Sequence, residues 1–314
     1  MLSAVHDDAL YDEAKAYQLV ESVLWPDGPV CPHCGVLNQS SPMKGKSTRI
    51  GTYKCYACRK KFTVKIGTIF EDSHIPMRFW LQTIFLLASS KKGISANQLH
   101  RTFGISLRSA WFMAHRLREA MRAGPLAPMG GDGGSGIVEI DETIFGRAAT
   151  HPKGRRRKNA KITNAAHKNV ILSLVERGGS VRSYHVAGST ASEVIPIVNA
   201  NVAKEASVMT DAAQLYKYRL GSFASHDRID HSKGEYAEYP EGRPVVHTST
   251  VENYFSVFKR GMRGTYQHCK EKHLHRYLAE FDFRYNARVA LGVNDEERAE
   301  RLLRSVRGKR LTYR

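Results

Sequence analysis

Two aspartates end or directly follow apolar runs of the kind that predicts β-strands. Asp141 ends the run 137–140, and Asp211 follows the run 207–210. A carboxylate in or beside a buried strand needs a cation or hydrogen-bond donors, because burying an unpaired charge is costly. The two aspartates are therefore candidates for a shared metal site.

A third acid lies in a segment whose apolar spacing predicts a helix beginning near Thr250. Glu252 and Lys259 are seven residues apart, which is two helical turns, so both side chains point the same way. The acid is suited to complete the metal site, and the lysine to approach the phosphate or sugar of a bound strand. Mg²⁺ or Mn²⁺ is the expected metal, and two such ions about 4 Å apart can promote a displacement at phosphorus.

Each acid also has an ordinary structural explanation. Asp141 could cap a turn, Asp211 could begin the helix that follows it, and Glu252 with Lys259 could form a solvated stripe. The order and setting of the three acids together are what favour catalysis.

Four of the five cysteines form two Cys-x-x-Cys pairs separated by twenty residues. This spacing is typical of a closed tetrahedral zinc site, in which four thiolates complete the shell and the metal stabilises the fold. The alternative is two unrelated redox-active or buried pairs. We expect a zinc ribbon with structural Zn²⁺ held by Cys31, Cys34, Cys55 and Cys58.

The composition gives 48 Lys and Arg residues against 30 Asp and Glu residues, a net charge of +18. Such an excess favours a polyanionic partner, and DNA is the expected one. The stretch from Arg147 to Lys168 has eight Lys and Arg residues and no acid, which is typical of a solvated loop or of a phosphate clamp. The cations expected to contact DNA near the acids are Arg155, Arg156, Arg157, Lys158, Lys259, Arg260 and Arg263.

The elements that must position these residues fall into four regions. Residues 1–70 hold the zinc ribbon, 71–122 form a helical DNA-binding region, 123–136 form a Gly- and Pro-rich linker, and 137–314 form the acid-bearing domain. The chain is therefore expected to be a multidomain protein.

The helical region has the pattern helix, short turn with glycine, helix. A helix is predicted at 95–103, Gly104 interrupts it, and Ser106 is suited to cap the next helix. The pattern is typical of a helix-turn-helix, although a plain helical hairpin has the same signature. If the last helix enters a DNA groove, Arg108 and Arg116 are the cations expected to contact DNA.

The C-terminal domain alternates predicted strands and helices. Three strands in a meander, a helix and a further strand indicate an α/β arrangement with a mixed sheet. The strands are predicted at 137–145, 169–175, 181–186 and 206–210, and the helices at 190–201, 250–262 and 273–284.

On these residues the chain resembles the DDE transposases of bacterial insertion sequences. It is most similar to the group with an N-terminal zinc ribbon and a ribonuclease-H-like catalytic domain, related to the Merlin elements. The resemblance implies that Asp141, Asp211 and Glu252 are the catalytic acids and that Lys259 contacts DNA. The segments that carry it are CPHCG, YKCYACRKKF, GISANQLHRTFGIS, AWFMAHRLR, VEIDETIFG, MTDAAQLY, HTSTVENYFSVFKRGMRGTYQH and KHLHRYLAEFDFRYN.

The resemblance implies binding of transposon ends, hydrolysis of a phosphodiester to free a 3′ hydroxyl, and transfer of that strand to target DNA. One two-metal site serves both steps, because both are displacements at phosphorus. Transposition joins two ends, so a homodimer or larger assembly on DNA is expected. Two other functions remain open: a non-catalytic zinc-ribbon and helix-turn-helix regulator, and a ribonuclease-H-like nuclease without strand transfer.

Neighbouring residues compete for two of the three acidic positions. Members of the group vary at the third position, so Asn253 and the HTST segment, with Ser249 where asparagine is common, are alternatives to Glu252. Strand alternation makes Glu139 a rival of Asp141, because it points to the same side of the strand, and places Glu142 on the opposite side.

No membrane span and no signal peptide are expected. The longest apolar stretch, around 79–88, is about half the length that spans a bilayer. The first residues include acids and lack a basic start followed by an apolar run, so a cytoplasmic location is expected.

Overall fold

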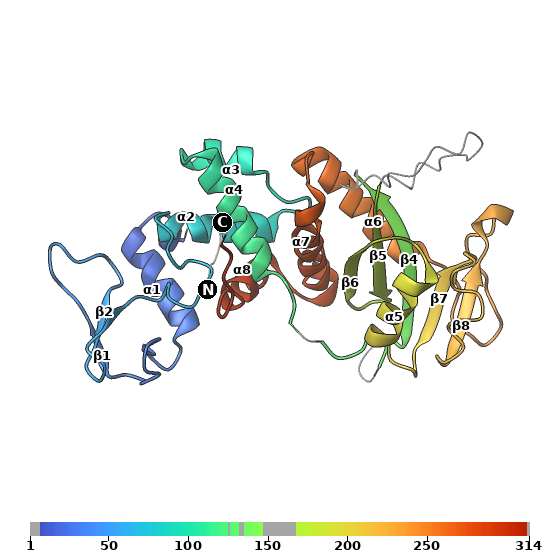
Figure 1. Cartoon of the computed structure of the whole chain (residues 1–314), viewed down its shortest axis with the longest axis horizontal. Coiled ribbons are helices and arrows are strands. Elements are labelled where there is room, and N and C mark those ends of the chain that lie inside the picture. Colours follow the sequence, from blue (N-terminus) through green and yellow to red (C-terminus); the bar gives the residue numbers. More distant parts are fainter. Residues whose placement is uncertain (1–6, 125, 132–134, 147–167, 313–314) are drawn as a thin grey trace. The chain divides into compact units, whose positions relative to one another are not determined.

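The computed structural model describes residues 7–124, 126–131, 135–146 and 168–312 (Figure 1). The chain divides into two compact units, Met1–Arg122 with Gly292–Arg314, and Ala123–Leu291. We call these unit 1 and unit 2. In the described part of the chain, no helix is long and apolar enough to cross a membrane.

Unit 1 contains a small antiparallel sheet with strand order β1-β2-β3, at Ser40–Pro42, Tyr53–Cys55 and Lys61–Phe62. Its core is made of aromatic rings and cysteines: Trp25 makes edge contacts with Tyr53 at 5.5 Å and with Phe62 at 5.8 Å between ring centroids. So small a core supplies little hydrophobic stabilisation, which is why a metal is suited to this module.

The rest of unit 1, where it is described, contains five α-helices and the 3-10 helix Asp8–Leu10. The expected turn is confirmed: Gly104 has φ +63°, and the Ser106 hydroxyl accepts a hydrogen bond from Ser109 N at 3.1 Å, which caps the last helix of the pair. That helix, α4, is largely buried, because residues 113–118 are all inaccessible to solvent or nearly so. The helices are α1 (Glu13–Leu24), α2 (Met77–Ser89), α3 (Ala96–Phe103), α4 (Leu107–Ala120) and α8 (Asp295–Arg304).

Helix α8 corrects the expected C-terminal boundary. It packs on α2, with Leu302 fully buried and with Arg298 Nη1 donating to the carbonyl of Ala88 at 2.7 Å. Residues 292–314 therefore belong to unit 1 and not, as predicted, to the acid-bearing domain. The prediction failed because the helix is very polar, and its few apolar residues give no indication of which unit they pack against.

Unit 2 is built on a five-stranded mixed sheet with strand order β6-β5-β4-β7-β8. The first three strands are antiparallel, whereas β7 and β8 run parallel to β4. The mixed sheet expected from the sequence is confirmed, and β8 is an addition to it. The strands are β4 (Ile137–Phe145), β5 (Asn169–Glu176), β6 (Val181–Val186), β7 (Ser207–Asp211) and β8 (Ser225–Ile229).

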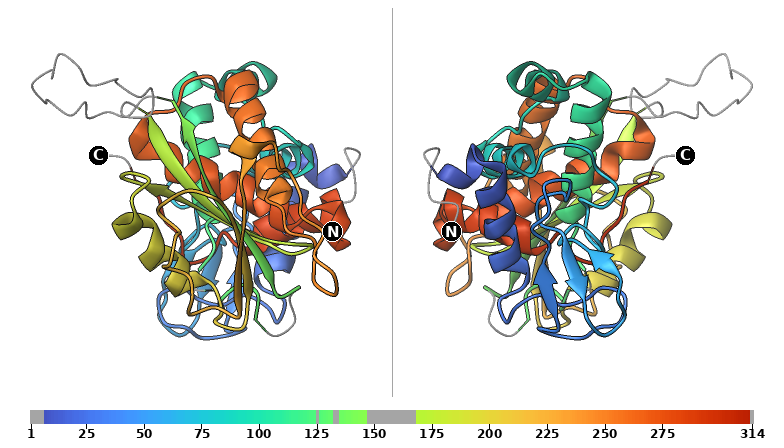
Figure 2. Two further views of the ribbon diagram at one scale, coloured as in Figure 1. Left: turned by 90° about the vertical axis from the view of Figure 1, so that its right-hand side faces the viewer. Right: turned by 90° about the vertical axis from the view of Figure 1, so that its left-hand side faces the viewer.

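Helices cover both faces of this sheet, as the left view of Figure 2 shows for α5 and α6. Helix α5 (Ala191–Asn201) packs against the face that presents Ile140 and Val208. Helices α6 (Ser249–Gly261) and α7 (Leu274–Asn286) pack against the opposite face, which presents Ile171 and Val175. Successive side chains of one strand therefore enter different cores.

Part of the expected linker is ordered against unit 2. Met129 N donates to Asn201 O at 2.7 Å, and Ala203 N donates to Met129 O at 2.8 Å. Gly130 has φ +74°, and a Cβ there would lie 2.6 Å from Cβ of Ala206, so only glycine fits this approach. Gly130 thus serves close packing as well as chain connection.

Candidate active site and zinc site

The first two acids lie side by side on neighbouring parallel strands. Ile140 of β4 pairs with Thr210 of β7, so the next residues, Asp141 and Asp211, are lateral neighbours. Since Ile140 enters the core beneath α5, Asp141 points to the other face, toward α6. Both aspartates therefore lie on one side of the sheet.

A cavity of about 520 Å³ opens beside Asp141. One wall comes from β4, and the other from α6 with the π-helical turn Met262–Tyr266 that follows it. Asp211 is not among its lining residues, but its charge raises the pKa of Asp141. The charged side chains that line the cavity are Asp141, Glu142, Glu252, Lys259, Arg260 and Arg263.

Two acids that line this cavity, Asp141 and Glu142, hold their protons more tightly than usual. Burial, followed by the charges of Asp211 and Glu142, raises the pKa of Asp141 to about 8. Burial also raises the pKa of Glu142 to about 7, although the Tyr216 hydroxyl donates a hydrogen bond to its carboxylate. A bound cation would relieve this clustering of acids, so the donor set suits a divalent metal.

Glu252 is oriented by His231, which the sequence interpretation missed, and by Thr248 of the HTST segment, which it named only as part of an alternative to Glu252. Its Oε1 lies 3.2 Å from Thr248 Oγ1, which donates to it, and 3.1 Å from Nε2 of His231. The other ring nitrogen of His231 faces the carbonyl of Glu235 at 3.1 Å. His231 and Glu252 are separated by twenty residues, so spacing gave no signal for this contact.

Glu139, the rival of Asp141, has a structural role. It is fully buried, and its Oε2 accepts hydrogen bonds from Thr250 N at 2.8 Å and Val251 N at 3.0 Å. Its Oε1 accepts from Arg177 Nε at 2.6 Å. The carboxylate therefore ties the N-terminus of α6 to β4, whereas Glu142, expected on the opposite side of β4 from Asp141, lines the cavity.

The other candidates for the third position lie outside the lining of the cavity. Asn253 is exposed on α6, and Ser249 Oγ lies 2.8 Å from His247 Nδ1. Glu252 lines the cavity together with Lys259, whose pKa is lowered by burial and then by Arg263. The structure thus brings Glu252 and Lys259 to one place.

The predicted DNA-contacting cations of unit 1 have different surroundings. Arg108 is exposed in the first turn of α4. The assignment of Arg116 was wrong: its guanidinium is buried and donates to the carbonyls of Ile69 and Glu71, each at 2.6 Å. The predicted contacts at Arg155, Arg156, Arg157 and Lys158 lie outside the described residues.

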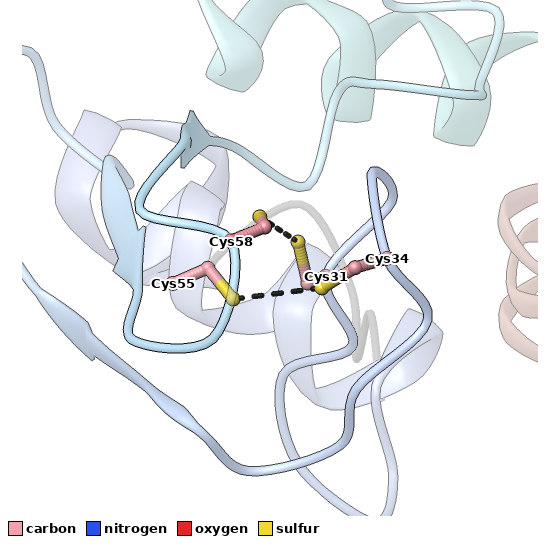
Figure 3. A group of neighbouring side chains, drawn as sticks. All are labelled: Cys31, Cys34, Cys55 and Cys58. Carbon is pink, nitrogen blue, oxygen red and sulfur yellow. Dashed lines mark hydrogen bonds between the residues drawn. The ribbon is translucent and has the colours of Figure 1, made fainter.

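The four cysteines of the ribbon converge from two loops, as Figure 3 shows. Their sulfur atoms all lie within 4.8 Å of one another, with Cys31–Cys58 and Cys34–Cys55 distances of 3.7 Å. Four Zn–S bonds of about 2.3 Å in a tetrahedron require sulfur atoms about 3.8 Å apart, so the geometry supports structural zinc. Among the described residues no other group of three or more His, Cys, Asp or Glu ligands is this close, so the three acids lie further apart.

Two family models match the chain. The transposase zinc-ribbon domain matches residues 11–61, and the ISXO2-like transposase domain matches residues 134–286. Residues 11–61 and 134–286 are thus identified as the zinc-ribbon and ISXO2-like domains of a transposase. This transposase is also 25% identical over 287 residues to an uncharacterized protein in transposable element ISH50 of Halobacterium salinarum, covering 87% of the chain and 90% of that relative.

Proposed function

We propose that unit 2 is a ribonuclease-H-like DDE catalytic domain in which Asp141, Asp211 and Glu252 are the catalytic acids. The observation that carries this proposal is the lateral pairing of Asp141 with Asp211 on the face of the sheet where Glu252 lines the adjoining cavity. The strand order, with three antiparallel strands followed by two parallel ones, supports the fold assignment.

The proposed reaction is hydrolysis of a phosphodiester at a transposon end, followed by attack of the freed 3′ hydroxyl on target DNA. Mg²⁺ or Mn²⁺, held as two ions by the three acids, would activate the attacking oxygen and stabilise the departing one. Lys259, Arg260 and Arg263 line the same cavity and are suited to hold the phosphates on either side of the scissile bond.

Substitution of each acid tests this proposal. Asp141→Asn, Asp211→Asn and Glu252→Gln are each expected to reduce Mg²⁺-dependent cleavage of labelled end DNA by roughly 10³-fold or more, while DNA binding persists. Asn253→Ala serves as the control, because Asn253 is an exposed neighbour outside the cavity lining. Wild-type cleavage by Glu252→Gln together with loss in Asn253→Ala would reassign the third position. Recovery of joined DNA products distinguishes a transposase from a nuclease.

We further propose that α3 and α4 form a helix-turn-helix that docks on DNA through the start of α4. Arg108 and Leu107 are exposed there, whereas the second half of the helix is buried. Arg108→Ala is expected to weaken binding to end DNA without changing zinc content. Unchanged binding would assign α3 and α4 to the core of unit 1 alone.

The pairing of two transposon ends also leads us to propose a dimer or larger assembly on DNA. Gel filtration of the transposase with end DNA is expected to show two chains and two ends in one complex. A complex of one chain on one end would oppose this.

A further inference from the structure

The charged residues of the cysteine-bearing part of the zinc ribbon are all positive. Between Gly28 and Phe70 the sequence contains eight Lys and Arg residues and no Asp or Glu. Seven of the eight are exposed, and the eighth, Lys65, is half-buried. The cations are Lys44, Lys46, Arg49, Lys54, Arg59, Lys60, Lys61 and Lys65. Such a surface has no internal acids to neutralise it, so it favours a polyanion.

A cavity of about 410 Å³ lies where the β1–β2 loop meets α1 and the start of α2. We call it the ribbon notch. Its walls combine cations with a tyrosine, and Glu13 is the one acid among the described residues that line it. The polar side chains used in the argument are Glu13, Tyr17, Arg49, Lys65, His74 and Arg78.

The charge of Glu13 is already used within unit 1. Its two carboxylate oxygens accept hydrogen bonds from Met77 N at 2.7 Å and Arg78 N at 3.2 Å, which satisfies the N-terminus of α2. Arg49 and Arg78 both line the notch, and the Arg78 guanidinium lies 5.2 Å from the centre of the Phe79 ring, so the described lining carries more positive than negative charge. Across the notch, the Nζ atom of Lys65 lies 5.5 Å from the centre of the Tyr17 ring.

The loop that carries Arg49 is held against α1. Gly51 has φ +70°, and a Cβ there would lie 2.3 Å from Cδ1 of Tyr17. Glycine therefore allows the backbone to pack directly on the ring. This contact fixes the backbone two residues after Arg49, which lines the notch.

We propose that the ribbon notch binds the phosphodiester backbone of DNA, with Arg49 and Arg78 contacting phosphates. The donors are the cationic side chains that line the notch, and burial raises the pKa of Tyr17 to about 12, so this side chain adds no negative charge. Such a set recognises phosphate and does not read base edges. The inference rests on the proposed function only in taking DNA as the substrate, and it does not involve the acids of unit 2.

The test compares two double variants of the full-length transposase. Arg49→Ala with Arg78→Ala removes the proposed phosphate contacts, and Arg59→Ala with Lys60→Ala removes two exposed cations of the same ribbon outside the notch. Fluorescence anisotropy with end DNA, without Mg²⁺, gives the dissociation constant at several salt concentrations. Zinc content and Tm establish that both variants are folded.

The notch variant is expected to bind end DNA roughly 10-fold more weakly, with the salt-dependence slope reduced by about 1 to 2, since each lost phosphate contact removes about 0.9. The control variant is expected to change both quantities much less. Equal losses in the two variants, or no loss in the notch variant, would overturn the inference. At saturating DNA, the notch variant is expected to keep its Mg²⁺-dependent cleavage, whereas Asp141→Asn is expected to lose cleavage and keep binding. Failure of the ribbon notch proposal is therefore distinguishable from failure of the proposed catalytic function.

Discussion

At the scale of single residues, the acids of the cavity are arranged at the expense of stability. Asp141 lies beside Asp211 and Glu142 in a half-buried place, and no cation of the described chain forms a close ion pair with it. Natural proteins often retain such unfavourable arrangements where function requires them. The raised pKa of Asp141 is therefore an indication of function that can be measured without DNA.

Asp141→Asn is expected to stabilise the metal-free protein at alkaline pH. The pKa of Asp141 is raised from 3.8 to about 8, so the folded state binds this proton more tightly than the unfolded chain does. The stability of the metal-free wild type therefore falls as pH rises through that interval. The substitution removes this penalty, and calorimetry is expected to show a Tm roughly 4 °C higher than wild type at pH 8.

At pH 5 Asp141 keeps its proton in folded wild type, and the loss of stability that follows from its raised pKa is smaller than at pH 8. The gain in Tm from Asp141→Asn is therefore expected to be smaller at pH 5. Glu193→Gln, on the exposed surface of α5, is the control and is expected to leave Tm unchanged at both pH values. A lower Tm for Asp141→Asn at pH 8 would show that the carboxylate is ionised and stabilised in the folded state.

At the scale of elements, the position of α6 depends on a buried ion pair. Glu139 of β4 joins the first turn of α6 to Arg177, and Arg177 also donates to the carbonyls of Val245 and His247. The strand that carries Asp141 and the helix that carries Glu252 are thus fixed to each other at one carboxylate. Glu139 is two positions from Asp141 on the same strand, which explains why the sequence alone offers both as candidates for the same catalytic position.

Glu139→Gln is expected to lower the free energy of unfolding by about 3 kcal/mol, because it leaves Arg177 buried beside an uncharged partner. Urea unfolding of the metal-free protein measures this. Glu176→Gln, at the end of β5, provides a comparison acid that lies outside the first turn of α6. If Glu139→Gln were as stable as wild type, the carboxylate would not hold the helix.

The sequence predicted those elements whose side-chain pattern is itself periodic. Strand β4, helix α3 and the Ser106 cap follow from alternation, helical spacing and a capping hydroxyl. Strand β8 was missed because its residues Ser225–Ile229 are mostly polar and it lies at the edge of the sheet. Arg116 was assigned to DNA because an arginine usually lies at the surface, whereas here two carbonyls satisfy its buried charge.

The candidate site could be predicted only in part. Each of the three acids occurs in a recognisable local setting: Asp141 follows the apolar first half of β4, Asp211 ends β7, and Glu252 lies in the first turn of α6. The contact of Glu252 with Thr248 is local, because the two residues are four positions apart at the start of α6. Its contact with His231 depends on how the segment between β8 and α6 folds back, and local pattern carries no such information. Residues that position other residues are therefore the ones that sequence reasoning misses.

At the scale of the whole molecule, the chain passes from unit 1 to unit 2 and returns. Residues 292–314 come back to unit 1, where the Lys309 ammonium donates to the carbonyl of Arg122 at 2.7 Å, the last residue before unit 2 begins. Unit 2 is thus an insertion within unit 1 in chain order. Removal of the C-terminal residues would damage the unit that carries the zinc ribbon, not the one that carries the acids.

A single substitution in α8 tests this division. Leu302→Ala is expected to destabilise unit 1 by about 2 to 5 kcal/mol, because a fully buried leucine leaves a cavity between α8 and its neighbours. Arg301→Ala, exposed on the same helix, is the control. Hydrogen exchange is expected to rise in α2 and α8 of Leu302→Ala while β4 and β5 keep their protection, since they belong to the other unit. Loss of protection in β4 and β5 with α2 unchanged would return the C-terminal helix to the acid-bearing domain.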